Sequence, residues 1–187
     1  KSAPEKLSIG VNVAVIGGGN TAMDAARAAK RVKGVRNVCL VYRRTKQFMP
    51  ADAEELELAV HEGVEFKELL APLSHENGML RCAKVVLGEP DESGHRSPVA
   101  TDETVLIPAD TVITAVGESV DTEIFKKNGI TLEKQGRAAT DSTTLETNIK
   151  GVYIAGDARR GPATVVEAIA DARRAADSIA ESEIGRA

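Results

Sequence analysis

The sequence predicts an α/β fold built on a parallel sheet, and three neighbouring segments near the amino end carry this prediction. Residues 11–16 and 38–42 are short, valine-rich apolar runs, too short for helices and typical of strands buried on both faces of a parallel sheet. Between them, residues 21–33 place small apolar side chains at helical spacing, and Gly34 ends the helix. Strand, helix and strand form one βαβ unit, whose crossover we expect to be right-handed.

A glycine-rich turn joins the first strand to the helix. Residues 17–22 read GGGNTA, so Gly17, Gly19 and Ala22 form the GxGxxA pattern of a Rossmann-like dinucleotide-binding turn, in the place where that pattern has to stand. Gly17 permits the tight turn, Gly19 lets backbone approach a pyrophosphate, and Ala22 keeps helix and strand close. The phosphates would meet free N–H groups at the helix start. The predicted cofactor-binding residues of the turn are Gly17, Gly18, Gly19, Asn20, Thr21 and Ala22. The alternative is a glycine turn without a ligand.

Two arginines at the end of the second strand favour NADP(H) over NAD(H). An NAD site usually has an acidic residue here for the ribose 2′-hydroxyl, whereas a 2′-phosphate needs a basic one. Arg43 and Arg44 stand at this place, and Arg43 follows Gly17 by 26 residues. Planar guanidinium groups suit phosphate geometry. The alternative is a solvated strand end.

The middle of the chain predicts a second helix and then an antiparallel meander. Residues 53–62 form the helix, with Asp52 as its N-cap and Gly63 as its end, and residues 64–66 form a third strand. Short alternating segments follow at 71–74, 80–87 and 104–107, with Asn77-Gly78 as a hairpin turn. Residues 88–98 read as a solvated loop. Residues 109–116 form another buried strand, which ends at Gly117.

The last third changes in composition and predicts short elements before a long helix. We expect a helix over 122–128, short strands over 129–132 and 136–140, and a buried strand over 152–155 that leads into Gly156-Asp157. Residues 158–162 form a loop, and residues 164–182 form the long helix. Its predicted inward side chains are Val165, Ile169, Ala172, Ala176 and Ile179.

Composition and charge exclude several functions. A net charge of −4, a pI near 5.5 and only 3% aromatic residues argue against nucleic-acid binding. No apolar run is long enough to span a membrane and no signal peptide is evident, so a cytoplasmic protein is expected. Cys39 and Cys82 belong to no CxxC pair and are expected in buried packing. The three histidines form no catalytic arrangement, and the acidic loop with His95 is read as exposed charge, not as a metal site.

The order of motifs resembles one family of flavin enzymes. The segments VAVIGGGNTAMDAARAAKRVKGVRNVCLVYRR, MP, HEGVEF, LGEPDESGHRSP and ADTVITAVGE are similar to the NADPH-binding part of the glutamate synthase small-subunit family of pyridine nucleotide:FAD oxidoreductases. The tail looks most like flavin subunits named as selenate reductases. In this family the NADPH domain is inserted between the halves of an FAD domain, and hydride passes from the nicotinamide to the flavin. No side chain is expected to act as a catalytic acid or base.

The resemblance implies a role for the last third of the chain. GVYIAGD followed by Gly161 and TVVEAI is similar to the second FAD motif of the family. It implies that Asp157 hydrogen-bonds the ribityl chain and that the helix start near Thr164, Val165 and Val166 faces the flavin. TAVG, ending at Gly117, resembles the segment that leads back to the FAD half. The alternative for Gly156-Asp157 is a strand-to-helix turn with an Asx contact.

These implications give a domain organisation and a set of missing parts. We expect a linker over 1–10, an NADP(H)-binding Rossmann-like domain over 11–118, and the carboxyl-terminal part of a split FAD domain over 119–187. The upstream GxGxxG and the iron–sulfur cysteines of the complete enzymes do not occur here, so a piece of a longer polypeptide is expected. It would hold FAD only in the full-length protein and work with a glutamate synthase-like or reductase partner subunit.

Three further expectations stay open at this point. The long helix would expose an apolar patch, bury it locally, or pair it in a homodimer. The chain could be a regulatory or sensory module that binds a dinucleotide without chemistry. It could also be a binding module that holds a partner through the acidic loop at 89–92.

Overall fold

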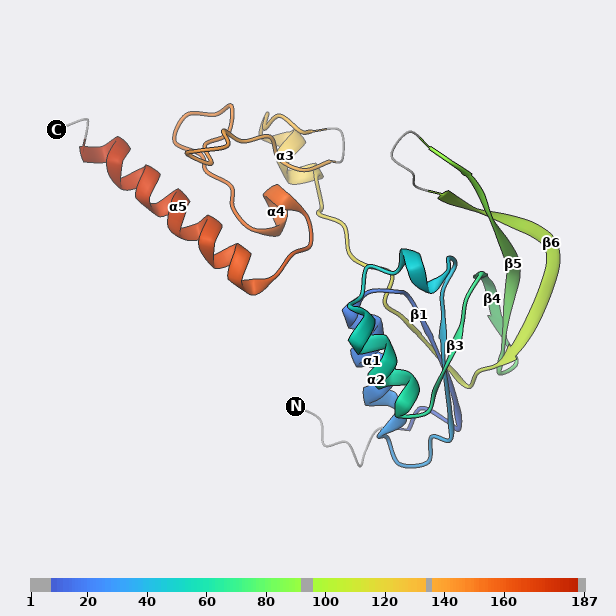
Figure 1. The fold of residues 1–187 in the computed structure, drawn as a ribbon. Helices are drawn as coiled ribbons and strands as arrows, with labels where there is room; N and C mark the ends of the chain where they lie inside the picture. Colours follow the sequence, from blue (N-terminus) through green and yellow to red (C-terminus); the bar gives the residue numbers. More distant parts are fainter. Residues whose placement is uncertain (1–7, 92–95, 134–135, 185–187) are drawn as a thin grey trace. The chain divides into compact units, whose positions relative to one another are not determined.

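The computed structural model describes residues 8–91, 96–133 and 136–184. The chain divides into two compact units, Lys1–Gly117 and Glu118–Ala187, which are described one at a time (Figure 1).

The first unit is built on a four-stranded parallel sheet with the strand order β3-β2-β1-β7. Its strands are β1 (Asn12–Ile16), β2 (Asn37–Val41), β3 (Val64–Lys67) and β7 (Thr111–Thr114). The register pairs Val15 with Leu40 and Ile113. Both predicted strands of the βαβ unit are confirmed, and β1 and β2 are buried over four of their five residues. β7 is shorter than the predicted strand and only partly buried, because it is an edge strand of the sheet.

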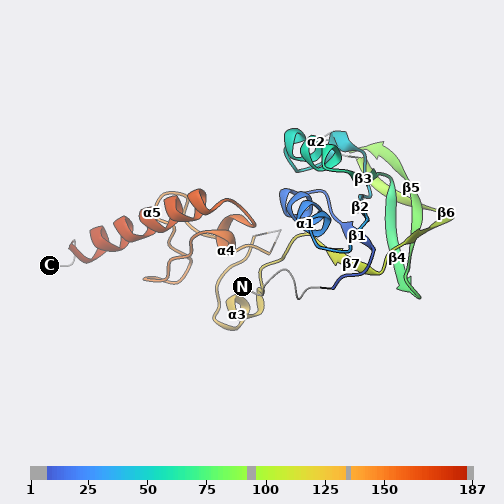
Figure 2. The same ribbon diagram turned by 90° about the horizontal axis from the view of Figure 1, so that it is seen from below.

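Helices α1 (Asn20–Lys30) and α2 (Ala53–His61) cover one face of this sheet, as Figure 2 shows. The alanines of α1 allow close packing, so that Ala22, Met23 and Ala26 are fully buried against Val13, Val15 and Leu40. A cluster of ion pairs joins the two helices, since the Arg27 guanidinium binds both Glu55 and Glu62 at 2.8–2.9 Å. Between β2 and α2 lies a short 3-10 helix, η2 (Lys46–Phe48).

An antiparallel sheet with the order β4-β5-β6 covers the other face. Its strands are β4 (Leu70–Glu76), β5 (Met79–Pro90) and β6 (Arg96–Pro108). The predicted hairpin turn is confirmed, because Asn77 and Gly78 have φ values of 51° and 71°. Leu80, Cys82 and Ile107 pack on Ala14, Cys39 and Val41 of the parallel sheet.

The loop predicted over 88–98 is largely wrong. β5 continues to Pro90 and β6 already begins at Arg96, with Leu87 opposite Pro98 and Pro90 opposite Arg96. Glycine and proline suggested a loop, but a two-stranded ribbon tolerates them where no third strand needs the missing N–H. Residues 92–95, which include His95 and part of the predicted acidic loop, lie outside the described residues.

The second unit has three helices, α3 (Glu123–Lys127), α4 (Asp157–Arg160) and α5 (Val165–Ile184), within its described residues. The strands predicted over 129–132, 136–140 and 152–155 are wrong: among the described residues of this unit, the pairing is limited to two isolated bridges, Leu132 with Ala138 and Glu146 with Tyr153. Apolar strand-like runs form ladders only where neighbouring strands pair with them, and no described segment does so here. The loop predicted over 158–162 contains the helical turn α4 instead.

The predicted inward face of the long helix is also wrong. Asp171 and Ala175 are the buried residues of α5, and Ala168 lies on the same side. Val165, Ile169 and Ile179 are 75%, 49% and 43% exposed, and Ala172 and Ala176 are exposed as well. The helix therefore turns Ala168, Asp171 and Ala175 inward, and its aliphatic stripe is exposed among the described residues.

Candidate dinucleotide site

The first glycine of the turn between β1 and α1 is required by the backbone. Gly17 has a φ of 151°, and a Cβ on it would stand 2.3 Å from the carbonyl oxygen of Ala115. Its N–H donates to the carbonyl of Val41 at 3.1 Å. Ala22, which is fully buried, lies 3.1 Å from the same Cβ position. A side chain at Gly17, or one larger than the methyl group at Ala22, would push α1 away from the sheet.

The next two glycines differ from each other. A Cβ on Gly18 would stand 2.4 Å from the ring of Tyr42, so packing within the chain requires this glycine. A Cβ on Gly19 would meet only the Cγ of Pro50, at 4.0 Å. Gly19 also has an ordinary extended backbone, with φ −95° and ψ 173°. Neither conformation nor packing explains this glycine, and the space beside it is open.

The start of α1 offers unused hydrogen-bond donors to that space. Among residues 8–91, 96–133 and 136–184, none accepts a hydrogen bond from the backbone N–H groups of Gly18, Gly19, Asn20 or Thr21. The first turn of α1 contains no acidic side chain. Free N–H groups at a helix start favour an anion, and the nearest carboxylate that the structure describes there, Asp52, is held by the carboxamide of Asn20.

The end of β2 supplies positive charge next to the turn. Arg43 is exposed, and its guanidinium makes no hydrogen bond or ion pair with any residue that the structure describes. Arg44 is half-buried, and its carbonyl accepts the N–H of Leu69 at 3.3 Å. The N–H of Lys46 donates to the Glu68 carboxylate at 3.0 Å. The backbone of the two arginines is therefore fixed by the segment that follows β3.

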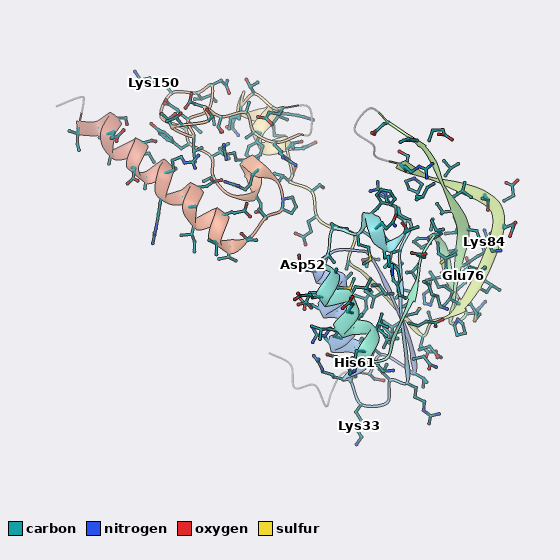
Figure 3. All side chains as sticks on the ribbon, in the orientation of Figure 1. Lys33, Asp52, His61, Glu76, Lys84 and Lys150 are labelled. Atoms are coloured by element: carbon teal, nitrogen blue, oxygen red, sulfur yellow. The ribbon has the colours of Figure 1, made fainter. Side chains whose placement is uncertain are left out.

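The loop between β2 and α2 returns across the glycine turn, a feature that the sequence did not reveal. The N–H of Ala51 donates to the carbonyl of Gly18 at 3.0 Å. The carboxamide of Asn20 pairs with Asp52, which Figure 3 labels at the start of α2. Asp52 stands at the predicted N-cap position, but its side chain makes no cap bond. The residues that could have signalled this contact are ordinary surface polar residues more than thirty positions apart.

Of the residues predicted to contact the flavin, Gly117 is the last residue of the first unit and the others belong to the second unit. Gly117 is exposed, with a φ of 90°. Gly156 has φ 64° and ψ −147°, a conformation that only glycine adopts readily. Asp157 is exposed at the start of α4, and no described residue hydrogen-bonds to its carboxylate.

The start of α5 has a capping box, which was not among the sequence-based expectations. The N–H and the hydroxyl of Thr164 both donate to the Glu167 carboxylate, at 3.0 and 2.8 Å, and the N–H of Glu167 donates back to the Thr164 hydroxyl at 3.3 Å. The T-x-x-E spacing was the signal that could have found it. Val165 and Val166 in the first turn are about three quarters exposed, at 75% and 76%.

Asp171 is a second residue that the sequence did not single out. It is fully buried, and it accepts hydrogen bonds from Arg160 at 2.9 and 2.5 Å and from the N–H of Gly156 at 3.3 Å. The hydrogen bonds from Arg160 lower the pKa of the Asp171 carboxyl to about 2. This carboxylate thus ties both ends of the Gly156–Arg160 segment to α5.

The two cysteines are both buried, as expected for packing residues. Burial raises the pKa of the Cys39 thiol to about 11 and also raises the pKa of the Cys82 thiol.

The described residues bring no three His, Cys, Asp or Glu side chains together as a metal site would. Of the helices in that part of the chain, none combines the length and the apolar character needed to cross a membrane.

A parallel sheet, a glycine turn and an open helix start define a protein of the Rossmann-like fold. The chain belongs to the pyridine nucleotide-disulphide oxidoreductase family, whose sequence model matches residues 1–172.

Relatives agree with the family resemblance seen in the motifs. The chain is 48% identical over 178 residues to the YgfK protein of Escherichia coli K12, covering 95% of this chain and 17% of YgfK. It is 44% identical to the NADP(+)-dependent formate dehydrogenase subunit beta of Moorella thermoacetica, over 89% of this chain and 24% of that subunit. It is 38% identical to the glutamate synthase [NADPH] small chain of E. coli, a match that covers 91% of this chain and 38% of that small chain. The chain therefore spans well under half of each of these relatives.

Solved structures show the same fold. Thioredoxin reductase of T. acidophilum matches with a TM-score of 0.74 at 24% identity, over 94% of this chain and 54% of that one. FprA of Mycobacterium tuberculosis in complex with NADPH matches with a TM-score of 0.67 at 20% identity, over 92% of this chain and 52% of the FprA chain.

Proposed function

We propose that the chain is the NADPH-binding segment of an NADPH-dependent flavin oxidoreductase in which hydride passes from the nicotinamide to FAD. The observation that carries the proposal is the open space at Gly19, bounded by the free N–H groups of the α1 start and located near the exposed Arg43. The family match and the NADPH named for several relatives support it.

The residues of the first unit fit a dinucleotide with a 2′-phosphate, as in NADPH. The N–H groups of residues 18–21 would bind the pyrophosphate, because a ligand can reach the backbone at Gly19 without meeting a Cβ. Arg43 and Arg44 would bind the 2′-phosphate that distinguishes NADPH from NADH. NADPH supplies the hydride, and the chain's own contribution is to bind and orient the nucleotide.

The residues of the second unit fit a contact with FAD. Asp157 has a carboxylate that no described residue engages, and it can accept hydrogen bonds from the ribityl hydroxyls. The start of α5, with Thr164, Val165 and Val166, can favour negative charge on a flavin ring through its free N–H groups. We assign 11–118 to the NADP(H) domain and 119–187 to the FAD domain, with Gly117 in the connection.

We propose that the chain works as part of a larger assembly. The relatives are longer polypeptides, and several are named as a subunit or a small chain. The remaining FAD half, iron–sulfur region and partner subunit would then carry electrons to the terminal acceptor. By itself the 187-residue chain should bind NADPH but leave gel filtration without FAD.

The test is a titration of the chain with NADPH and with NADH, repeated after Arg43→Ala. The unaltered chain should bind NADPH more tightly than NADH. Arg43→Ala should lose about tenfold in NADPH affinity and keep its NADH affinity, because one charge-assisted contact to the 2′-phosphate is removed. Arg36→Ala is a matched control, since Arg36 is also exposed but precedes β2 at the opposite end of the sheet. Equal affinities for the two nucleotides, or an unchanged NADPH affinity in Arg43→Ala, would contradict the assignment.

A further inference from the structure

The loop between β2 and α2 is fastened across the glycine turn at several points. Its last part, residues 48–52, is called the strap here. The Tyr42 ring lies against Gly18, and its hydroxyl donates to the carbonyl of Phe48 at 2.7 Å. The N–H of Ala51 donates to the carbonyl of Gly18 at 3.0 Å. The strap therefore follows the glycine turn closely and is held at both of its ends.

Asn20 makes the outermost of these attachments with both of its side-chain polar atoms. Its Oδ1 accepts the backbone N–H of Asp52 at 3.1 Å, and its Nδ2 donates to Oδ2 of Asp52 at 3.3 Å. Asp52 uses its carboxylate here, although it occupies the N-cap position of α2. The carboxamide of Asn20 is thus directed to the strap, while its backbone N–H stays available at the start of α1.

The strap lies beside the open space at Gly19. Apart from Gly19 and its chain neighbours, the Cγ of Pro50, in the middle of the strap, is the atom that a Cβ on Gly19 would meet, at 4.0 Å. Asn20 and Asp52 are both exposed, so their hydrogen bonds contribute only modestly to folding stability. Their larger effect is on binding, because a loop that is already held in place need not be ordered when a ligand arrives.

We propose that Asn20 is a positioning residue, which holds the strap through Asp52 and so fixes one side of the open space at Gly19 that receives the dinucleotide pyrophosphate. The inference rests on the proposed function, since it assumes that a dinucleotide binds at the glycine turn. The strap would act on the pyrophosphate, which NADPH and NADH share. Arg43, in contrast, would act on the 2′-phosphate, which NADH lacks.

The inference predicts a characteristic pattern of affinities. Asn20→Ala removes both hydrogen bonds to Asp52 and should weaken NADPH and NADH by the same factor, roughly three- to tenfold. Asp52→Ala keeps the bond from its backbone N–H to Oδ1 of Asn20, so it should weaken both nucleotides by a smaller common factor. The ratio of the two affinities should not change. The double variant should bind no more weakly than Asn20→Ala, because Asn20→Ala already removes both bonds of the attachment. Asp52→Asn should recover affinity relative to Asp52→Ala, because the asparagine carbonyl can still accept from Nδ2 of Asn20.

The experiment is a fluorescence titration of the 187-residue chain and these variants with NADPH, and calorimetry with NADH, well below every unfolding midpoint. Asn37→Ala is the matched control. It removes an exposed asparagine whose Nδ2 donates to Oδ1 of Asn12 at 2.8 Å, at the opposite end of β1 and β2. Its affinities should equal those of the unaltered chain.

Several results would overturn the inference. Unchanged affinities in folded Asn20→Ala and Asp52→Ala would do so, as would additive losses in the double variant or an equal loss in Asn37→Ala. A change confined to NADPH would also contradict it, because the strap would then act on the 2′-phosphate. These results leave the proposed function intact if the unaltered chain binds NADPH. Failure of the unaltered chain to bind either nucleotide would overturn both.

Discussion

The three adjacent glycines of the turn have three different environments, and only the first two are required by the chain itself. Gly17 is needed for its backbone conformation and for its approach to Ala115, and Gly18 is needed for the ring of Tyr42. Gly19 has neither constraint. A substitution series along the turn therefore separates folding from binding one residue at a time.

Gly19→Ala should abolish most nucleotide affinity without unfolding the chain. The new methyl group fits the chain at an ordinary φ of −95°, but it occupies the open space where a pyrophosphate would approach the backbone. We expect at least a tenfold loss of NADPH affinity and a change in the free energy of unfolding below about 0.5 kcal/mol. Titration and chemical denaturation of the same sample measure the two quantities.

Gly18→Ala is the natural comparison for Gly19→Ala. Its methyl group would meet the Tyr42 ring, so the free energy of unfolding should fall by about 1–3 kcal/mol. If Gly19→Ala destabilised the chain as much as Gly18→Ala and bound NADPH normally, the open space would have no role in binding.

At the scale of elements, α5 shows how a correct helix can be predicted with the wrong face inward. The apolar spacing of Val165, Ile169 and Ile179 suggested a buried stripe, yet these side chains are exposed and Asp171 is buried instead. Periodicity identifies a face that favours burial but not the segment that buries it. On the buried side of α5, the Arg160 guanidinium pairs with Asp171.

The start of α5 depends on its capping box. Thr164→Ala removes the hydroxyl that accepts the N–H of Glu167 and leaves that donor of the first turn unsatisfied. The free energy of unfolding should fall by about 1 kcal/mol, which chemical denaturation followed by circular dichroism measures. Thr164→Ser keeps the hydroxyl and should stay close to the unaltered chain. Equal losses in both variants would show that the methyl group, and not the cap, is responsible.

At the scale of the whole molecule, the first unit was predicted far better from sequence than the second. The strands, helices and hairpin of the first unit have local signals, such as the valine runs of β1 and β2, the alanines of α1 and Asn77-Gly78. The second unit consists mostly of irregular segments joined by side-chain bonds, such as Asp141 to the N–H groups of Thr143 and Thr144. Such bonds have no periodic pattern that would announce them.

The same difference applies to the candidate site. The glycine turn and the arginine pair could be found from sequence, because their spacing follows from the βαβ unit itself. The pairing of Asn20 with Asp52 and the burial of Asp171 could not, because each joins residues whose neighbourhood exists only after folding.

The stability of the whole chain should fall in acid, and Asp171 should account for the steepest part of the fall. Hydrogen bonds lower the pKa of several carboxyl groups in both units. These groups are Glu62, Glu103, Asp110, Asp141, Glu167 and Asp171. A carboxyl group whose pKa is lower in the folded state stabilises the fold above its unfolded pKa, and this stabilisation disappears as the pH falls through its folded pKa.

For Asp171 this window lies between an ordinary value of 3.8 and about 2. Thermal unfolding followed at pH 6, 4 and 3 should therefore show midpoints that fall with pH. Asp171→Asn should lower the midpoint at pH 6, because Arg160 loses its buried anion, and should flatten the decline below pH 4, because no carboxyl group remains there to be protonated. Asp177→Asn, on the exposed side of the same helix, should leave both quantities unchanged. An equally steep decline in Asp171→Asn would assign the acid sensitivity to the other carboxyl groups, since the buried ion pair would then contribute no protonation-linked stability.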